Sequence, residues 1–142
     1  MINKMSVKFD SVSENEAFAR NVIASFILPL NPSISELSDI KTAVSEAVTN
    51  AIVHGYPDSV GEVYMCVEYD GNEIHITVKD SGVGIENIER ALKPFFTTKP
   101  DDERSGMGFT IIKTFMDEVK VESKPNVGTV VEMYKTITEN AV

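Results

Sequence analysis

Hydrophobic and polar residues alternate in several short segments, with the two-residue period of half-buried strands. These segments are residues 4–9, 63–69, 74–78, 119–121 and 129–133. Asp70-Gly71 separates the second segment from the third, and an Asp-Gly pair in this position is typical of a β-hairpin. Asn126 to Gly128 predicts a turn between the last two segments. The pattern therefore predicts five strands, four of them in two hairpins.

Helical periodicity begins at Ser13, which forms a capping-box pattern with Glu16. The helix that they open is expected to carry Phe18, Val22 and Phe26 inward and to end before two prolines, at 29 and 32. The sequence thus predicts an amphipathic helix directly after the first strand.

A longer helix is predicted over residues 35–54, with Gly55 as its C-cap. Its apolar stripe consists of Leu37, Ile40, Val44, Ala47, Val48 and Ala51. Residues 109–116 have the pattern of a third helix. The segment before it, residues 86–105, is polar and poorly periodic, and so long a loop in a compact domain is usually functional or disordered. Helices combined with antiparallel strands predict an α+β sandwich.

Charge and cysteine content narrow the class of protein. The net charge of −9 opposes binding to nucleic acid or an anionic membrane and favours a basic partner. Cys66 is the only cysteine, which excludes an internal disulfide and fits a reducing cytoplasm. The N-terminus lacks the apolar run of a signal peptide, and no apolar stretch is long enough to cross a bilayer. We therefore expect a soluble cytoplasmic protein with a single domain over residues 1–142.

Glu46 and Asn50 lie one helical turn apart beside the apolar stripe of the second helix. For a lone pair of this kind, a solvated helix edge is the simpler interpretation. Their chemistry favours a second one, because an Asn carbonyl oxygen is a suitable hard ligand for Mg²⁺. A Glu one turn earlier can take a proton from a hydroxyl or a water that attacks a γ-phosphate. His54, another turn along, is expected to cap or pack at the helix end.

Asp80 follows a buried-looking strand and precedes Ser-Gly-Val-Gly. An ordinary turn would explain these residues, since a single Gly-x-Gly is weak evidence. The functional interpretation is that Asp80 accepts a hydrogen bond from an exocyclic amine such as that of adenine. Gly82 and Gly84 would then let the backbone pass close to the base and ribose. Thr129, at the start of a strand, either reinforces this contact or only favours the strand.

The segment Ser-Gly-Met-Gly at 105–108 precedes the predicted helix over residues 109–116. Backbone N–H groups at a helix N-terminus bind anions, and glycines permit a close wrap around them. Upstream, Arg104 and Lys99 can reach phosphate oxygens, although solvation on a loop explains Lys99 equally well. The sequence has no P-loop, none of the segments of eukaryotic-type protein kinases and no Cys/His cluster for zinc. Together the three segments indicate an ATP site built without a P-loop.

In this order, the three segments resemble the N, G1 and G2 boxes of the GHKL ATPase/kinase superfamily, which includes gyrase and the histidine kinases. Residues 13–20, 44–56, 94–100 and 103–110 closely resemble the anti-sigma serine kinases of sporulation in bacilli and clostridia. The resemblance covers residues 5 to about 134. It implies the Bergerat fold, a two-layer α/β sandwich whose mixed, mostly antiparallel sheet has helices on one face.

The resemblance also implies ligands and partners. The ligands are ATP and Mg²⁺, with ADP as product. The partners are a sporulation sigma factor, which such proteins hold inactive, and an anti-anti-sigma protein, which they phosphorylate on serine. A homodimer is implied as well.

By position, Glu46 resembles the catalytic base of this family and Asn50 its Mg²⁺ ligand. Arg20 matches an arginine with which the family contacts both partners. The other matched positions resemble nucleotide-binding residues: Asp80, Gly82, Gly84, Ser105, Gly106, Met107, Gly108 and Thr129, with Thr97, Thr98, Lys99 and Arg104 in a nucleotide lid over about 86–105.

Three alternatives remain at the level of the sequence. The first is an anti-sigma serine kinase of the stress-response type. The second is a stand-alone GHKL ATPase or histidine-kinase-like domain, although neither His54 nor His75 lies in a recognisable acceptor helix. The third is a nucleotide-gated binding module without catalysis. Glu46 argues against that module, because a protein that only binds does not need a base.

Overall fold

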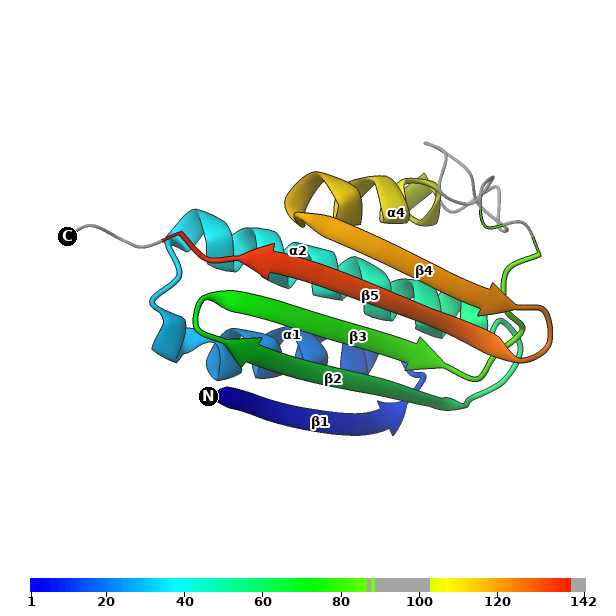
Figure 1. The fold of residues 1–142 in the computed structure, drawn as a ribbon. Helices are drawn as coiled ribbons and strands as arrows, with labels where there is room; N and C mark the ends of the chain where they lie inside the picture. The colour runs from blue at the N-terminus through cyan, green and yellow to red at the C-terminus, as the bar shows by residue number, and fades with distance from the viewer. Residues whose placement is uncertain (87, 89–102, 139–142) are drawn as a thin grey trace.

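The fold is built on one five-stranded sheet (Figure 1). The structure is a computed structural model that describes residues 1–86, 88 and 103–138, without the side chains of 103–108. The sheet has the strand order β1-β2-β3-β5-β4. Its strands are β1 (Ile2–Asp10), β2 (Glu62–Asp70), β3 (Glu73–Asp80), β4 (Glu118–Lys124) and β5 (Gly128–Thr136). All four pairings between them are antiparallel, so the sheet is not mixed.

The helices of the described chain cover one face of this sheet (Figure 1). They are α1 (Glu14–Phe26), the short 3-10 turn η1 (Leu28–Leu30), α2 (Ile34–Asn50), the π-helical turn η2 (Ala51–Gly55) and α4 (Glu103–Phe115). The helix α2 packs against both α1 and α4. The predicted two-layer α+β sandwich is thus confirmed.

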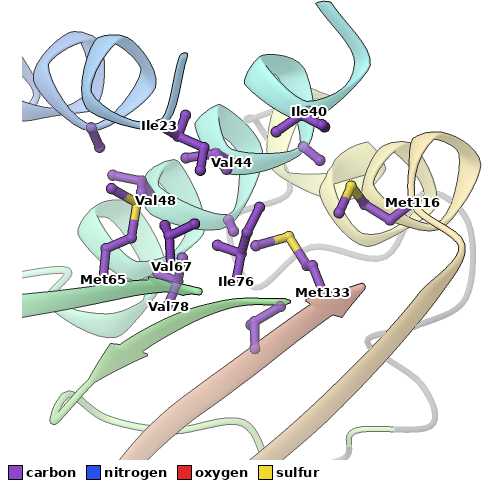
Figure 2. Packing of buried hydrophobic residues seen from close by; sticks show 14 of the residues in the cluster. Ile23, Ile40, Val44, Val48, Met65, Val67, Ile76, Val78, Met116 and Met133 are labelled. Carbon is purple, nitrogen blue, oxygen red and sulfur yellow. The ribbon is translucent and has the colours of Figure 1, made fainter. Parts of the chain in front are cut away.

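The core lies between the two layers (Figure 2). Ile23 of α1 and Val44 of α2 are fully buried on the helical side, and Val67, Ile76 and Met133 on the side of the sheet. Full burial of such a side chain stabilises the folded state by about 1.5–3 kcal/mol. The alternating residues of β2 and β3 supply the inner face, as their two-residue period predicts.

Both predicted hairpin turns are confirmed. Gly71 occupies the turn between β2 and β3 with φ +58°, a left-handed conformation that favours glycine. The turn between β4 and β5 contains Asn126 with φ 65°, and Gly128 follows with φ 138°. Local sequence therefore determines both turns.

The buried side of α1 is centred one residue away from the predicted one. Ala19 and Ile23 are completely buried, whereas Phe18 is 46% exposed. Val22 and Phe26 are only partly buried against the edge of the core. The helix thus packs through a small and a β-branched residue, and Phe18, Val22 and Phe26 form the neighbouring strip at the edge of the core.

The capping box lies on α2, not on α1. Ser13 precedes α1 in a helical conformation, and its side chain makes no capping hydrogen bond. Ser33 precedes α2 with extended backbone, and its Oγ accepts a hydrogen bond from the Glu36 N–H at 3.0 Å. In return, the Ser33 N–H donates to Glu36 Oε1 at 2.9 Å. The pattern at Ser13 and Glu16 was therefore misread as a cap.

Glu36 also holds the chain that follows β5. Its Oε2 accepts hydrogen bonds from the N–H and the Oγ1 of Thr138, at 2.8 and 2.9 Å. Burial opposes ionisation of this carboxyl, but the hydrogen bonds from Ser33 and Thr138 outweigh it and lower the pKa of Glu36 to about 2. One carboxylate thus fastens the start of α2 and the end of β5.

Two helix ends differ from the sequence prediction. The helix α2 continues into η2, and Gly55 ends this π-helical turn without the positive φ of a C-cap glycine. The helix α4 begins at Glu103, not at 109, so the segment 105–108 lies inside its first two turns. The loop predicted over 86–105 is correspondingly shorter at its C-terminal end. No helix in the described part of the chain has the length and apolar character needed to span a bilayer.

Candidate nucleotide site

Glu46 and Asn50 occupy successive turns at the C-terminal end of α2. Glu46 is only 8% exposed, which excludes the solvated helix edge as its setting. Asn50 is half-buried, and its Nδ2 has no hydrogen-bond partner within the described chain. A buried amide without a partner loses hydrogen bonds to water on folding, which favours binding of a polar ligand there. His54 lies beyond them in η2, where π-helical winding ends the i, i+4 spacing.

Asp80 is the last residue of β3 and is only 6% exposed. Burial raises the pKa of its carboxyl above the usual 3.8, and hydrogen bonds from the backbone of Gly82 and Thr129 oppose this rise. The Gly82 N–H donates to Asp80 Oδ1 at 2.9 Å. These bonds fix the direction of the carboxylate, which can accept further hydrogen bonds from a ligand.

Two glycines allow the end of α2 to approach this carboxylate. A Cβ on Gly55 would come within 2.9 Å of the Asp80 carboxyl, and a Cβ on Gly82 within 1.9 Å of the Gly55 carbonyl oxygen. The Val83 N–H donates to that same carbonyl at 2.8 Å. Any side chain at either glycine would separate η2 from the loop after β3. The structure therefore brings Asp80 and Gly82 together with Gly55, which the sequence had suggested only as a helix cap.

Gly84 lies where the same loop meets the turn between β4 and β5. It has φ +74°, and a Cβ there would lie 2.1 Å from the Lys124 carbonyl oxygen. Next to it, the Ile85 N–H donates to Ser123 Oγ at 2.7 Å. Ser123 Oγ also lies 2.7 Å from Thr129 Oγ1. Close backbone packing is thus the observed role of Gly84.

Thr129 is the cross-strand partner of Asp80 and is 7% exposed. Its backbone hydrogen bond to Asp80 places it beside the carboxylate, and its role toward adenine stays a prediction. The glycine before it, Gly128, packs so closely that a Cβ would lie 2.1 Å from the Asp80 carbonyl oxygen. Two strands and two loops therefore meet around Asp80.

The remaining nucleotide-site residues of the sequence prediction are not tested by these contacts. The backbone of Arg104, Ser105, Gly106, Met107 and Gly108 lies within α4, so the glycine pair does not precede this helix. Thr97, Thr98 and Lys99 lie outside the described residues. Their roles toward phosphate stay predictions.

Arg20 lies away from Asp80, on α1. Its guanidinium pairs with Glu16 at 3.8 Å, and 41% of its side chain is exposed. A groove of about 390 Å³ runs beside it and is lined by Arg20, Ile34, Leu37, Ser38, Lys41, Thr42 and Ser45. The groove carries two cations on a chain of net charge −9, so it differs in charge from the molecule as a whole.

The described residues fit ATP and Mg²⁺ by their chemistry. Backbone at three glycines packs closely around the Asp80 carboxylate, which can accept hydrogen bonds, and the Asn50 Nδ2 can donate to an oxygen of a ligand. No group of three His, Cys, Asp or Glu side chains suited to a metal occurs in the described part of the chain. A protein site for Mg²⁺ that relies on one or two side chains is typical where substrate phosphates supply the other ligands.

Comparison with known proteins identifies the family. The model of the histidine kinase-like ATPase domain matches residues 10–135. The chain is 54% identical over 141 residues to the anti-sigma F factor of Anoxybacillus flavithermus and 55% identical over 141 residues to that of Geobacillus sp. strain WCH70, covering 99% of this chain and 97% of each relative. It is 54% identical over 135 residues to the anti-sigma F factor of Thermoanaerobacter sp. strain X514, covering 95% and 94%.

Solved structures show the same fold at low sequence identity. The RsbU and RsbW domains of Rv1364c from Mycobacterium tuberculosis superpose with a TM-score of 0.70 at 16% identity, covering 98% of this chain and 34% of that one. The catalytic domain of histidine kinase ThkA gives 0.59 at 20% identity, covering 94% and 97%. The chain therefore belongs to the histidine kinase-like ATPase family and, within it, to the family of the anti-sigma F factors.

Sequence reasoning missed Gly55, Gly128 and Ser123 as parts of this site. Their importance comes from contacts between segments that lie far apart along the chain, and no local pattern encodes such contacts. For Gly55 a signal existed, since it stands between His54 and Tyr56 in a segment that carried the family resemblance. It was interpreted only as the end of a helix.

Proposed function

We propose that the protein is an anti-sigma factor and an ATP-dependent protein serine kinase. It binds Mg·ATP, holds a sporulation sigma factor inactive, and phosphorylates an anti-anti-sigma protein on serine, leaving ADP. The observation that carries the nucleotide part is Asp80, a buried carboxylate held in a glycine-lined frame at the end of a strand. The identity of more than half of all residues with anti-sigma F factors supports the choice of partners.

In this proposal each residue near the site has one task. Asp80 accepts a hydrogen bond from the exocyclic amine of adenine, with Thr129 beside it. Asn50 holds Mg²⁺ through its carbonyl oxygen. Bound Mg·ATP would supply the γ-phosphoryl group, and its Mg²⁺ would neutralise negative charge that develops during transfer.

Phosphoryl transfer also needs a base near the acceptor hydroxyl. Glu46 takes this task, because it is one turn from Asn50 and is shielded from bulk water. It accepts the proton of the acceptor serine. The segments 97–99 and 104–108 contact the phosphates.

The partners are proposed from charge and exposure as well as from the relatives. The net charge of −9 favours basic surfaces on a partner, whereas Arg20 and Lys41 in the groove favour an acidic group of that partner. Arg20 stands on α1, which carries none of the proposed nucleotide residues. Arg20 therefore contacts the sigma factor and the anti-anti-sigma protein without touching ATP. The active protein is a homodimer.

The direct test is incubation of the protein with radiolabelled ATP, Mg²⁺ and a purified anti-anti-sigma protein. Transfer of label to a serine is expected. Glu46→Gln keeps the size of the side chain and removes the base, so transfer should fall about 10²–10⁴-fold, with ATP and sigma-factor binding unchanged. Wild-type transfer by this variant would refute Glu46 as the base. Asn50→Ala should instead weaken ATP binding only in the presence of Mg²⁺.

The same assay separates the alternative functions. Labelling of a histidine on the protein itself would indicate a histidine-kinase-like domain. ATP hydrolysis without transfer would indicate a stand-alone ATPase, and sigma-factor binding without either would indicate a binding module. A stress-response-type factor would phosphorylate its own antagonist and not the sporulation protein.

A further inference from the structure

Tyr56 joins three elements at the point where β3 ends. It follows η2 directly, and its hydroxyl donates a hydrogen bond to the Glu62 carbonyl oxygen at 2.7 Å. The same hydroxyl accepts a hydrogen bond from the Ser81 N–H, also at 2.7 Å. Both hydrogen-bonding roles of the hydroxyl are therefore used.

The position of this hydroxyl in the sheet gives it a structural effect. The pairing of β2 with β3 ends at Val63 and Asp80, so the next residues in register are Glu62 and Ser81. The tyrosine hydroxyl lies between these two residues and bridges them. It thereby ties the peptide after Asp80 to the first residue of β2, beyond the last pair of the ladder.

The ring of Tyr56 has a fixed support. A Cβ on Gly61 would lie 2.2 Å from the ring, so the ring rests directly on the backbone of this glycine. Gly61 is itself held from both sides by Ser11, which is only 6% exposed. The Gly61 N–H donates to Ser11 Oγ at 2.9 Å, and the Ser11 N–H donates to the Gly61 carbonyl at 2.8 Å. A continuous set of contacts thus runs from Ser11 to Ser81.

We propose that Tyr56 is a positioning residue for the carboxylate that recognises the base, and that it thereby sets the preference of the site for adenine. The carboxylate accepts a hydrogen bond from the Gly82 N–H, only one residue beyond the peptide that Tyr56 holds. Release of Ser81 would let Gly82 move, and Asp80 would lose the bond that orients its Oδ1. This inference rests on the proposed function, because it takes Asp80 as the residue that recognises adenine.

The test compares Tyr56→Phe with the wild-type protein in titrations with ATP and with GTP, both with Mg²⁺. The variant keeps the ring and loses only the hydroxyl. ATP affinity should fall about 3–10-fold, the range expected for one hydrogen bond, and GTP affinity should change less. The ratio of the two affinities should therefore decrease. A merely structural role would lower the melting temperature without changing this ratio.

Tyr69→Phe is the matched control. The Tyr69 hydroxyl also accepts one hydrogen bond, from Asn3 Nδ2 at 2.9 Å, but it lies near the other end of β2. This variant should leave both affinities unchanged. Gly61→Ala is a second variant that keeps the Tyr56 hydroxyl and removes the space for its ring. It should reproduce the loss of preference for ATP.

The outcomes separate this inference from the proposed function. If the wild-type protein prefers ATP and Tyr56→Phe keeps that preference, the inference is wrong and the proposed function is unaffected. An equal loss of affinity for both nucleotides also overturns it, because positioning for adenine must affect ATP more. A wild-type protein without preference for ATP overturns the proposed role of Asp80 and the inference with it. Faster amide exchange at Ser81 in the Tyr56→Phe protein, together with a lower ratio, supports the inference.

Discussion

At the scale of single residues, the burial of Asp80 affects the chemistry of the site most, because it changes when the carboxyl is protonated. Its carboxyl is buried, and burial raises the pKa because a charged group loses hydration there. Protonation turns one of its oxygens into a hydrogen-bond donor and weakens the carboxyl as an acceptor. Recognition of adenine should therefore depend on pH more strongly than for a carboxylate on the surface.

We expect ATP affinity to fall on acidification, starting at a pH above that at which an ordinary aspartate is protonated. The sign follows from the raised pKa, because Asp80 takes up its proton earlier as the pH decreases. Titrations with ATP between pH 7.5 and 5 measure the effect. Asp80→Asn cannot titrate, so its weaker affinity should change less over the same interval. Parallel curves for the two proteins would contradict the assignment.

Substitution by alanine should have different effects at Gly82 and Gly71, because the added methyl group would have different neighbours. At Gly82 it would lie 1.9 Å from the Gly55 carbonyl oxygen, which belongs to rigid backbone. We expect Gly82→Ala to abolish ATP binding and to destabilise the protein by more than about 2 kcal/mol, since the loop or η2 must move. Nucleotide titration and chemical denaturation measure both effects.

Gly71→Ala provides the comparison. Nothing lies within 4 Å of a Cβ at Gly71, but its φ of +58° is unfavourable for alanine. The expected cost is about 1–2 kcal/mol of stability, from backbone strain alone. ATP binding should stay unchanged because the turn is far from Asp80. Equal loss of ATP binding in the two variants would show that Gly82 has no special place in the site.

At the scale of elements, the two N-terminal serines of α1 and α2 give a direct test of capping. Ser33 accepts a hydrogen bond from the backbone of its helix, whereas Ser13 does not. Ser33→Ala should therefore destabilise the protein by about 1 kcal/mol, and Ser13→Ala should have an effect near zero. Thermal melting of both variants measures the difference. A larger loss for Ser13→Ala would mean that a cap forms there in solution.

The elements also show where sequence reasoning succeeds and where it fails. The hairpin at Gly71 and the period of β2 and β3 are local properties, and both were predicted. The cap predicted at Ser13 is wrong, because the Glu16 side chain contacts Ser45 and Arg20 and makes no bond back to the start of its own helix. The early start of α4 likewise has no signal in a segment with glycines at 106 and 108.

At the scale of the whole molecule, the sequence proposes Glu46, Asn50 and Asp80 as site residues but does not predict how Asp80 is held. The frame that holds it consists of glycines from η2, the loop after β3 and the turn before β5. Its contacts depend on how the layers pack, which no single segment determines. Residue types and spacing therefore suggest a chemistry for the site, whereas its support follows only from the packing.

Nucleotide and partner sites should be separable by mutation, because Arg20 lies on α1 and the base site at the end of β3. We expect Arg20→Ala to leave ATP affinity unchanged and to weaken capture of the sigma factor about tenfold or more, as for a central interface arginine. Calorimetric titrations with ATP and with the sigma factor measure the two effects.

Lys120→Ala is a suitable control for charge. Like Arg20, Lys120 is a partly exposed cation with a nearby carboxylate, here Glu118 at 3.9 Å. It lies on β4 and does not line the groove beside Arg20. Its removal should change sigma-factor binding little. Equal weakening by both substitutions would mean that only net charge matters and that Arg20 makes no specific contact.

The π-helical turn η2 imposes a constraint on length as well as on sequence. Hydrogen bonds from residue i to i+5 accommodate one residue more than an α-helical turn would. Gly55, where an added Cβ would lie 2.9 Å from the Asp80 carboxyl, is the last residue of this wider turn. A deletion of one residue there, even one that spared every residue of the site, would rotate all later positions about the helix axis. The length of this segment is therefore constrained together with the identity of Gly55, and only positions that do not touch the site can exchange side chains freely.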